Sequence, residues 1–283
     1  MADKSKISIV GAGNVGFALA YAFANLGHAV SLISRNKQDA QERLSEALSA
    51  KSLDQPASLS LHEYPEKFEG QHFILLTVPD GKIKSTCEAI ADGLSGDEVV
   101  LHCSGALDSS LLVSAKAKGC PIASAHPLNT FPNLSAALNA LDPDHGTYLY
   151  CEGDISATDR IKPLFEDAGF RTADIDASSK TLYHAACVFA CNYLTVLMDM
   201  SLETAKAADL DPEDFWQACQ PIIKATLLNL DRHTTADALS GPVARGDMET
   251  VERHLQELHD KAPELAATYQ AFTDYAIAML KRP

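Results

Sequence analysis

Residues 6–16 read KISIVGAGNVG, a β-branched run followed at once by a glycine-rich turn and then by an apolar, helix-periodic segment. A turn of this kind presents free backbone amides at the helix start, where they attract phosphate. The spacing of its glycines permits a tight turn, close approach of a pyrophosphate and close helix packing. A strand-to-helix turn without a ligand is the alternative. The residues expected to contact a dinucleotide here are Gly11, Gly13, Asn14, Val15 and Gly16.

Short β-branched runs alternate with helical patterns from residue 5 to about residue 176. The runs are KISIV, HAVSLIS, HFILLTV, DEVVLHC, TYLYC and FRTADID, and the helical patterns span 14–26, 37–50, 80–95, 108–118 and 155–168. This alternation predicts an α/β fold of the Rossmann type, with a doubly wound, mainly parallel sheet. After Asp176 the sequence contains no convincing strand. We therefore expect a dinucleotide-binding domain at 1–177 and an all-helical substrate and dimerisation domain at 178–283.

Two positions in the helical half indicate where helices begin. Asp211 followed by Pro212 predicts a capped helix start, and Asp247 is expected to cap another helix. Pro221 is expected to kink or interrupt the first of these helices, because proline removes a backbone donor.

The composition excludes several classes of function. With 38 acidic and 23 basic residues, the formal charge of -15 disfavours nucleic acid or an anionic membrane as the main partner. The N-terminus lacks a signal-peptide pattern, so a cytoplasmic location is expected. Histidine, asparagine and aspartate interrupt the apolar window at 184–200, which favours a packed helix over a membrane span. The seven cysteines form no CxxC pair, which predicts reduced thiols and no structural zinc.

The end of the second predicted strand should decide the cofactor. A carboxylate there would bind the ribose 2'-hydroxyl of NAD, but the sequence reads Ser34-Arg35-Asn36. An arginine can bind a 2'-phosphate through paired, charge-assisted hydrogen bonds. These three residues therefore predict NADP rather than NAD. The alternative is that Arg35 is only a solvated loop residue.

Two further segments should lie at the carboxyl edge of the sheet, where ligands bind in this architecture. TVPD at 77–80 places Val78 and Pro79 beside the ribose or nicotinamide, and HCSGAL at 102–107 offers Ser104 to a substrate. Ser104 is equally compatible with a role in the turn itself.

Four segments behind the glycine-rich turn carry a family resemblance: LHCSGAL, SAHPLNTFPN, KTLYHAACVFACN and SGPVARGDMETVERHL. In this order they resemble a family with a Rossmann-like N-terminal half and a helical C-terminal domain of unknown function. That family is similar to deazaflavin-dependent NADP reductases and, more broadly, to 6-phosphogluconate and 3-hydroxyacid dehydrogenases, pyrroline-carboxylate reductase and prephenate dehydrogenase. The resemblance implies a cleft closed by the helical domain and a homodimer formed through that domain. Fold-level likeness does not identify the substrate.

KTLYHAACVFACN places Lys180, His184, Cys187 and Cys191 on one helical stripe. A metal site would need a fourth ligand, so no metal is predicted. In the hydroxyacid dehydrogenases a lysine and, four positions later, an asparagine face the nicotinamide; Lys180 matches the lysine, and His184 replaces the asparagine. Histidine titrates near pH 6.5 and lysine near 10.4, so His184 is the better proton donor, unless burial of Lys180 exchanges the roles. The alternatives are a solvated lysine and an interface histidine.

Two residues complete the candidate site. His126 begins HPLNTF, and the resemblance to prephenate dehydrogenases makes it a third catalytic candidate, with a purely loop-shaping role as the alternative. Arg245 in SGPVARGD is a candidate to grip a substrate carboxylate, or else it pairs with a neighbouring acid. The sequence thus predicts an NADP-dependent oxidoreductase acting on a small, anionic carbonyl, hydroxy acid or imine. The alternative is a non-catalytic NADP-binding sensor or scaffold.

Overall fold

The computed structural model describes residues 4–64, 68, 70–140 and 146–282. The chain divides into two compact units, Met1–Phe189 and Ala190–Pro283, which are described separately below. The division lies about one helix beyond the composition change at residue 177, because the helix that begins at Lys180 packs with the first unit. The boundary predicted from composition stays a prediction.

The first unit contains an eight-stranded sheet of order β3-β2-β1-β4-β5-β6-β7-β8. Its strands are β1 (Lys6–Val10), β2 (Ala29–Ile33), β3 (Leu59–His62), β4 (Phe73–Leu76), β5 (Val99–His102), β6 (Ile122–Leu128), β7 (Tyr148–Gly153) and β8 (Arg171–Asp174). All neighbouring strands are parallel except β6 and β7, so the predicted mainly parallel fold is confirmed. The four residues of β3 were not among the predicted strands, because LSLH is too short to give a clear periodic signal.

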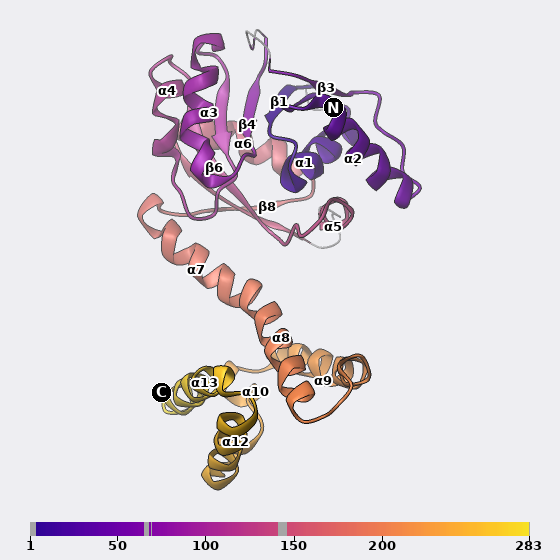
Figure 1. The fold of residues 1–283 in the computed structure, drawn as a ribbon. Coiled ribbons are helices and arrows are strands. Elements are labelled where there is room, and N and C mark those ends of the chain that lie inside the picture. The colour runs from indigo at the N-terminus through magenta and orange to yellow at the C-terminus, as the bar shows by residue number, and fades with distance from the viewer. Residues whose placement is uncertain (1–3, 65–67, 69, 141–145, 283) are drawn as a thin grey trace. The chain divides into compact units, whose positions relative to one another are not determined.

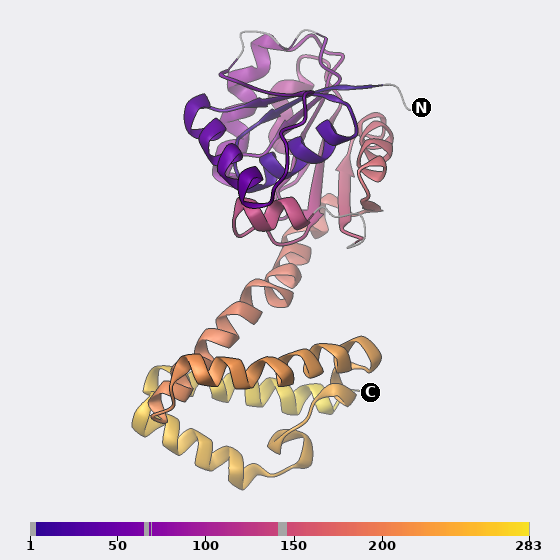
Figure 2. The same cartoon turned by 90° about the vertical axis from the view of Figure 1, so that its right-hand side faces the viewer.

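Helices cover both faces of this sheet (Figures 1 and 2). They are α1 (Asn14–Asn25), α2 (Lys37–Ala50), α3 (Ile83–Ile90), α4 (Val113–Lys116), α5 (Leu134–Ala140) and α6 (Ile155–Asp167). Helix α7 (Lys180–Ala190) does not cover the sheet, and Lys180 is its one buried residue. One buried cluster joins the sheet to α1, α2 and α6, and a second joins its other face to α3 and α4. The chain reverses its direction of winding between β1 and β4, which are hydrogen-bonded neighbours. Ligands bind at such a switch point in open α/β sheets.

The second unit consists of helices in the residues that the structure describes. They are α8 (Asn192–Ala207), α9 (Pro212–Arg232), α10 (Thr235–Ala238), α11 (Pro242–Arg245), α12 (Met248–Lys261) and α13 (Pro263–Leu280). The predicted cap at Asp247 is confirmed, since its side chain accepts a hydrogen bond from Thr250 N at 3.2 Å. A small buried cluster in this unit consists of Leu258, Ala262 and Ala266.

Of the two effects expected at Pro221, the interruption is wrong, because α9 runs through it, and the kink stays a prediction. The start of α9 is strongly fixed: the Asp211 side chain accepts hydrogen bonds from Glu213 N and Asp214 N at 2.9 and 3.0 Å, and Pro212 occupies the first turn. A well-capped helix of 21 residues keeps enough backbone hydrogen bonds to tolerate the one that proline removes. A helix break that was not predicted lies at Cys191, which separates α7 from α8.

Candidate functional site

The glycine-rich turn is held against the end of β4. Gly11 has φ +119°, and a Cβ atom there would lie 2.6 Å from the carbonyl oxygen of Thr77, while one at Gly16 would overlap the carbonyl oxygen of Gly11. The Thr77 hydroxyl also donates to Gly11 O at 2.7 Å. By contrast, a Cβ at Gly13 would have only Thr77 O nearby, at 3.9 Å. The turn is therefore tight where it meets the fold and open at Gly13.

The first turn of α1 leaves its backbone amides available. Gly13 is the N-cap residue and supplies no side-chain cap. The side chain of Asn14 points elsewhere, since its Nδ2 donates to Phe131 O at 2.9 Å and ties the turn to the segment after β6. Val15 is half-buried and packs against the core. A phosphate at this position would thus meet backbone amides, which is the arrangement that dinucleotides use.

The residues predicted to choose the cofactor form a compact loop at the start of α2. The Ser34 hydroxyl accepts from Asn36 N at 3.2 Å, and Asn36 Oδ1 caps α2 by accepting from Asp39 N at 3.1 Å. Arg35 is exposed. Burial raises the pKa of Tyr64, and the positive charge of Arg35 opposes that shift. Arg35 is a solvent-accessible cation at the end of β2.

The end of β4 presents the other two predicted cofactor residues. Val78 is half-buried and packs against the cluster on the α3 face, and Pro79 is exposed. A Cβ on Gly11 would lie 3.1 Å from Val78 Cγ1, so Val78 borders the glycine-rich turn. Both positions lie beside the switch point between β1 and β4.

Ser104 organises the turn that follows β5. Its hydroxyl donates to Asp80 Oδ2 at 2.9 Å and accepts from the backbone amides of Ala106 and Leu107 at 3.2 and 3.0 Å. The residue is 6% exposed. These contacts show that Ser104 stabilises the turn, which is one of the two roles that the sequence allows. Direct contact with a substrate stays a prediction.

Lys180 is buried, with 1% of its surface exposed. Its Nζ donates to Ser104 O at 2.9 Å and to Ser124 Oγ at 2.5 Å, so it joins the first turn of α7 to β6 and to the turn after β5. Burial lowers the pKa of Lys180, while the nearby Glu152 carboxylate acts in the opposite direction. Two of the three ammonium donors therefore bind protein oxygens.

Tyr183 is a site residue that the sequence did not reveal. Its hydroxyl lies 2.8 Å from His126 Nδ1, although the two residues are 57 positions apart in the chain. Burial, followed by the positive charges of Lys180 and His184, lowers the pKa of His126 to about 4, and burial also raises the pKa of Tyr183. Both groups are therefore neutral near pH 7. The one feature of the sequence that could have indicated Tyr183 as a site residue is its position one helical turn after Lys180.

His184 and His126 converge on Gly105. A Cβ at Gly105 would lie 2.5 Å from His184 Nδ1 and 2.9 Å from His126 Nε2. The two rings meet edge to face, with centroids 5.8 Å apart. His184 Nδ1 is buried and has no hydrogen-bond partner among the described residues. The structure therefore brings together all three predicted catalytic residues, with Tyr183 beside them.

The cysteines of the same stripe play no evident part in this cluster's chemistry. Cys187 is half-buried beside Tyr183, whereas Cys191 is exposed at the helix break. In the described ranges, no group of three or more histidine, cysteine or acidic side chains has a metal-binding arrangement.

Arg245 lies in the helical unit, at the end of the short helix α11. It is exposed and is followed by Gly246, which has φ +70°. Hydrogen bonds from Thr250 lower the pKa of Asp247, and the charges of Arg245 and Arg253 add to this effect. Both predicted roles of Arg245, binding a substrate carboxylate and pairing with a neighbouring acid, stay predictions.

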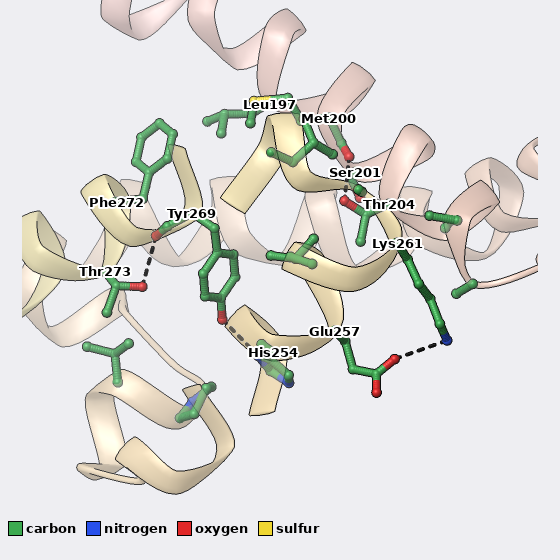
Figure 3. A pocket seen from close by; sticks show the side chains of 18 of the residues that line it. Leu197, Met200, Ser201, Thr204, His254, Glu257, Lys261, Tyr269, Phe272 and Thr273 are labelled. Carbon is green, nitrogen blue, oxygen red and sulfur yellow. Dashed lines mark hydrogen bonds and ion pairs between the residues drawn. The ribbon is translucent and has the colours of Figure 1, made fainter. Parts of the chain in front are cut away.

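The helical unit contains a cavity of about 790 Å³ between α8, α12 and α13 (Figure 3). Apolar side chains dominate its wall, among them Leu197, Met200, Leu265 and Phe272. Its polar groups are largely paired with each other: His254 Nδ1 lies 2.8 Å from the Tyr269 hydroxyl, and Lys261 forms an ion pair with Glu257 at 3.0 Å. This cavity is much larger than a packing defect.

The fold and this site define a dinucleotide-binding α/β protein with an added helical unit. Residues 2–127 match the model of a Rossmann-like domain, and residues 147–276 match a domain of unknown function, DUF2520. The chain therefore matches a Rossmann-like domain and then a DUF2520 domain, which confirms the predicted family resemblance, while the predicted boundary at residue 177 stays a prediction. No curated protein matches the sequence.

Solved structures of the same fold cover nearly the whole chain. A proposed NADP oxidoreductase from Bacteroides fragilis is 18% identical, with a TM-score of 0.77 over 97% of this chain and 98% of that one. A reductive aminase from Aspergillus terreus, in complex with NADPH and ethyl-5-oxohexanoate, is 14% identical, with a TM-score of 0.67 over 98% and 94%. Pyrroline carboxylate reductase from Plasmodium falciparum, with NADP bound, is 14% identical, with a TM-score of 0.60 over 98% of both chains. At these identities the likeness shows the fold.

Proposed function

We propose that the protein is an NADP-dependent oxidoreductase that transfers hydride between the nicotinamide and a small carbonyl, hydroxy acid or imine. The observation that carries the proposal is the convergence of His126 and His184 on Gly105, with the Tyr183 hydroxyl bonded to His126, in the same unit as the glycine-rich turn at the switch point. Hydride transfer to a carbonyl or imine needs a proton donor at the neighbouring heteroatom. The solved reductases that share this fold, with NADPH or NADP bound, support the same class of reaction.

The residues of the turn fit a dinucleotide. Gly13 leaves the turn open, and the uncapped start of α1 offers amides to the pyrophosphate. Exposed Arg35, with Ser34 and Asn36 holding the loop around it, would bind the 2'-phosphate of NADP, and Val78 and Pro79 would border the ribose or nicotinamide. When bound, the cofactor supplies or accepts the hydride.

The side chains at Gly105 would then handle the proton. His184 has an unpartnered Nδ1 aimed at Gly105, and the neutral His126 shares a hydrogen bond with the neutral Tyr183 hydroxyl, so a proton gained by His126 would create an imidazolium beside that hydroxyl. We propose His184 and His126 as the groups that exchange a proton with the substrate, with Tyr183 as the partner of His126. Lys180 would hold α7 in place, and its remaining ammonium donor is available to polarise a substrate oxygen.

The substrate class follows from less direct support. Arg245 remains a candidate for binding a substrate carboxylate, and Ser104 shapes the turn on which the two histidines converge. A small anionic substrate is compatible with isolated arginines in a protein with a formal charge of -15. The location of the substrate between the two halves of the chain, expected from the sequence, stays part of the proposal.

We also propose a cytoplasmic homodimer formed through the helical unit. One described segment, Ala177–Ala207, is long and apolar enough to cross a membrane by length and composition, with a mean hydropathy of 1.5 over its most apolar part. Lys180, near its start, is instead hydrogen-bonded inside the first unit, and α8 lines the open cavity of Figure 3. A second copy packing on this surface would bury its apolar side chains.

Turnover and binding measurements test this proposal. Purified protein should bind NADPH more tightly than NADH and should oxidise NADPH with members of a panel of oxo acids, ketones and cyclic imines. His184→Ala and Lys180→Ala should retain NADPH binding and lose turnover. Binding of NADPH without oxidation across the panel would favour the sensor or scaffold function, and wild-type turnover in both variants would remove the catalytic assignment.

A further inference from the structure

Arg43 is a second arginine beside the proposed cofactor site. It lies on α2, and its Nη1 donates to the carbonyl oxygen of Ala12, between Gly11 and Gly13, at 3.2 Å. Its guanidinium carbon lies 5.4 Å from the ring centroid of Phe17, which belongs to α1. Arg43 thus contacts both the glycine-rich turn and the helix that follows it.

The guanidinium keeps most of its donors available. Arginine carries five N–H donors, and the hydrogen bond to Ala12 uses one of them. The Asp39 carboxylate lies 3.9 Å away, and the two side chains are 59% and 43% exposed, so this ion pair is weak. The cation is therefore fixed in place by the turn but is not neutralised by a buried acid.

The position of Arg43 on α2 directs it toward the ribose of a bound dinucleotide. It follows the N-cap residue Asn36 by seven positions, so both lie on one stripe of the helix, and helical side chains tilt toward the N-terminus. In this architecture the ribose 2'-position lies between the glycine-rich turn and the end of β2. Arg35 stands at the end of β2, and Arg43 stands at the turn.

We infer that Arg43 is a second specificity-determining residue, which binds the 2'-phosphate of NADP from the side opposite Arg35. The inference rests on the proposed NADP site. Its hydrogen bond to Ala12 would hold the guanidinium at the turn while two of its free N–H groups meet phosphate oxygens. Charge-assisted hydrogen bonds of this kind are stronger than neutral ones and depend on the planar fork of arginine.

The test compares NADPH and NADH binding to the full-length chain by fluorescence titration at one fixed salt concentration. Arg43→Gln should weaken NADPH binding about tenfold, equivalent to about 1.4 kcal/mol, and should leave NADH binding within about twofold. Arg43→Lys should give an intermediate loss, because an ammonium keeps the charge and lacks the fork. Arg232→Gln, which makes the same change in net charge on the helical unit, serves as the control.

Three outcomes would overturn the inference. Equal weakening of NADPH and NADH would mean that Arg43 only supports the turn, and unchanged binding of both would mean that it does neither. If Arg35→Gln removes the preference for NADPH while Arg43→Gln keeps it, the cofactor choice stands and this inference fails. If the wild-type chain shows no preference for NADPH, the NADP proposal itself fails. Should Arg43→Gln fold poorly, Arg43→Lys with an unchanged melting temperature gives the same comparison.

Discussion

The two units of this chain differ in how completely they bury their apolar residues. In the first unit, two clusters cover both faces of the sheet, and side chains as large as Phe17, Phe23 and Phe165 are fully buried. In the helical unit, Ile222 is 66% exposed and Tyr275 is 58% exposed. The comparison teaches that the first unit has an extensive core of its own, with Leu182 and Phe189 of α7 exposed, whereas the helical unit has a small core and many exposed apolar side chains of the kind that normally pack against something else.

The titratable groups follow the same division. The described groups with the largest pKa shifts all belong to the first unit, and they include His102 and His126. Large shifts require burial, and the helical unit has little buried volume of its own. The strongly desolvated titratable groups among the described residues therefore lie in the first unit.

The largest expected effect comes from charging the exposed face of the helical unit. Ile222→Asp should convert a dimer into a monomer, because it places a carboxylate where a second copy would cover an isoleucine. Burying such a side chain contributes about 1.5–3 kcal/mol, and a two-fold contact counts it twice, so the dimer dissociation constant should rise by roughly two to four orders of magnitude. Analytical ultracentrifugation over a concentration series measures this.

Two controls make that result specific. Gln217→Asp adds the same charge to an exposed polar position of α9, and Ile155→Asp changes an isoleucine that is 78% exposed on the first unit. Neither should alter the association state. A wild-type chain that is monomeric at all concentrations would contradict the proposed homodimer, and the contrast between the units would then need another explanation.

Acid should weaken the first unit in particular. Burial lowers the pKa of both His102 and His126 from 6.5 to about 4. Between these two pH values the imidazoles are protonated in the unfolded chain and neutral in the folded chain. The stabilisation is complete above pH 6.5 and is lost as the pH falls to about 4. Each imidazole accounts for at most about 3 kcal/mol.

Urea unfolding of the full chain at several pH values between 7 and 4 checks the sign and the size. Stability should fall steadily with acid, and the fall should become shallower in His102→Gln, which removes one of the two imidazoles. A stability that stays constant or increases from pH 6.5 to pH 4.5 would show that these histidines are not desolvated in the folded protein.

Local patterns predicted much of the fold because its signals lie close together in the chain. The run KISIV followed by GAGNVG, and the cap at Asp247, each specify structure within a few residues. Pro221 shows the limit of such rules. The long, well-capped helix α9 continues through this proline, although a local rule predicts that a proline can interrupt a helix. Whether a second copy covers α8 and α9 depends on packing that no periodic pattern contains.

The site was predicted in part for a related reason. Spacing alone placed Lys180 and His184 on one stripe, but it could not show that Lys180 is buried against Ser124. The contact of Tyr183 with His126 and that of Arg43 with Ala12 each join segments that are distant in the chain. Such contacts depend on how helices dock on the sheet, so they became visible only in the folded structure.

A smaller effect is expected at the contact between the turn after β5 and α7. Gly105→Ala would place a methyl group against His184 and His126, and overpacking of this kind typically costs about 1–3 kcal/mol. Gly81→Ala is the matched control, because a Cβ there would have nothing within 4 Å. Urea midpoints of the two variants give the comparison. Equal midpoints would mean that α7 is not held on the first unit in the way described.

The smallest effect on stability, and the most informative for chemistry, is expected from Tyr183→Phe. The substitution removes the hydroxyl that lies 2.8 Å from His126 Nδ1 and keeps the ring, which packs on Tyr150 with centroids 4.7 Å apart. The lost hydrogen bond should cost about 1 kcal/mol of stability. If the His126–Tyr183 pair handles the proton, turnover with any accepted substrate should fall by roughly a hundredfold or more, while NADPH binding stays unchanged.

The control is Tyr148→Phe, at a position that is 42% exposed in the same group of rings, and it should change neither stability nor turnover. Wild-type turnover in Tyr183→Phe would make the tyrosine a packing residue and leave His184 as the remaining proton donor, so this variant separates the structural contribution of α7 from its chemical one.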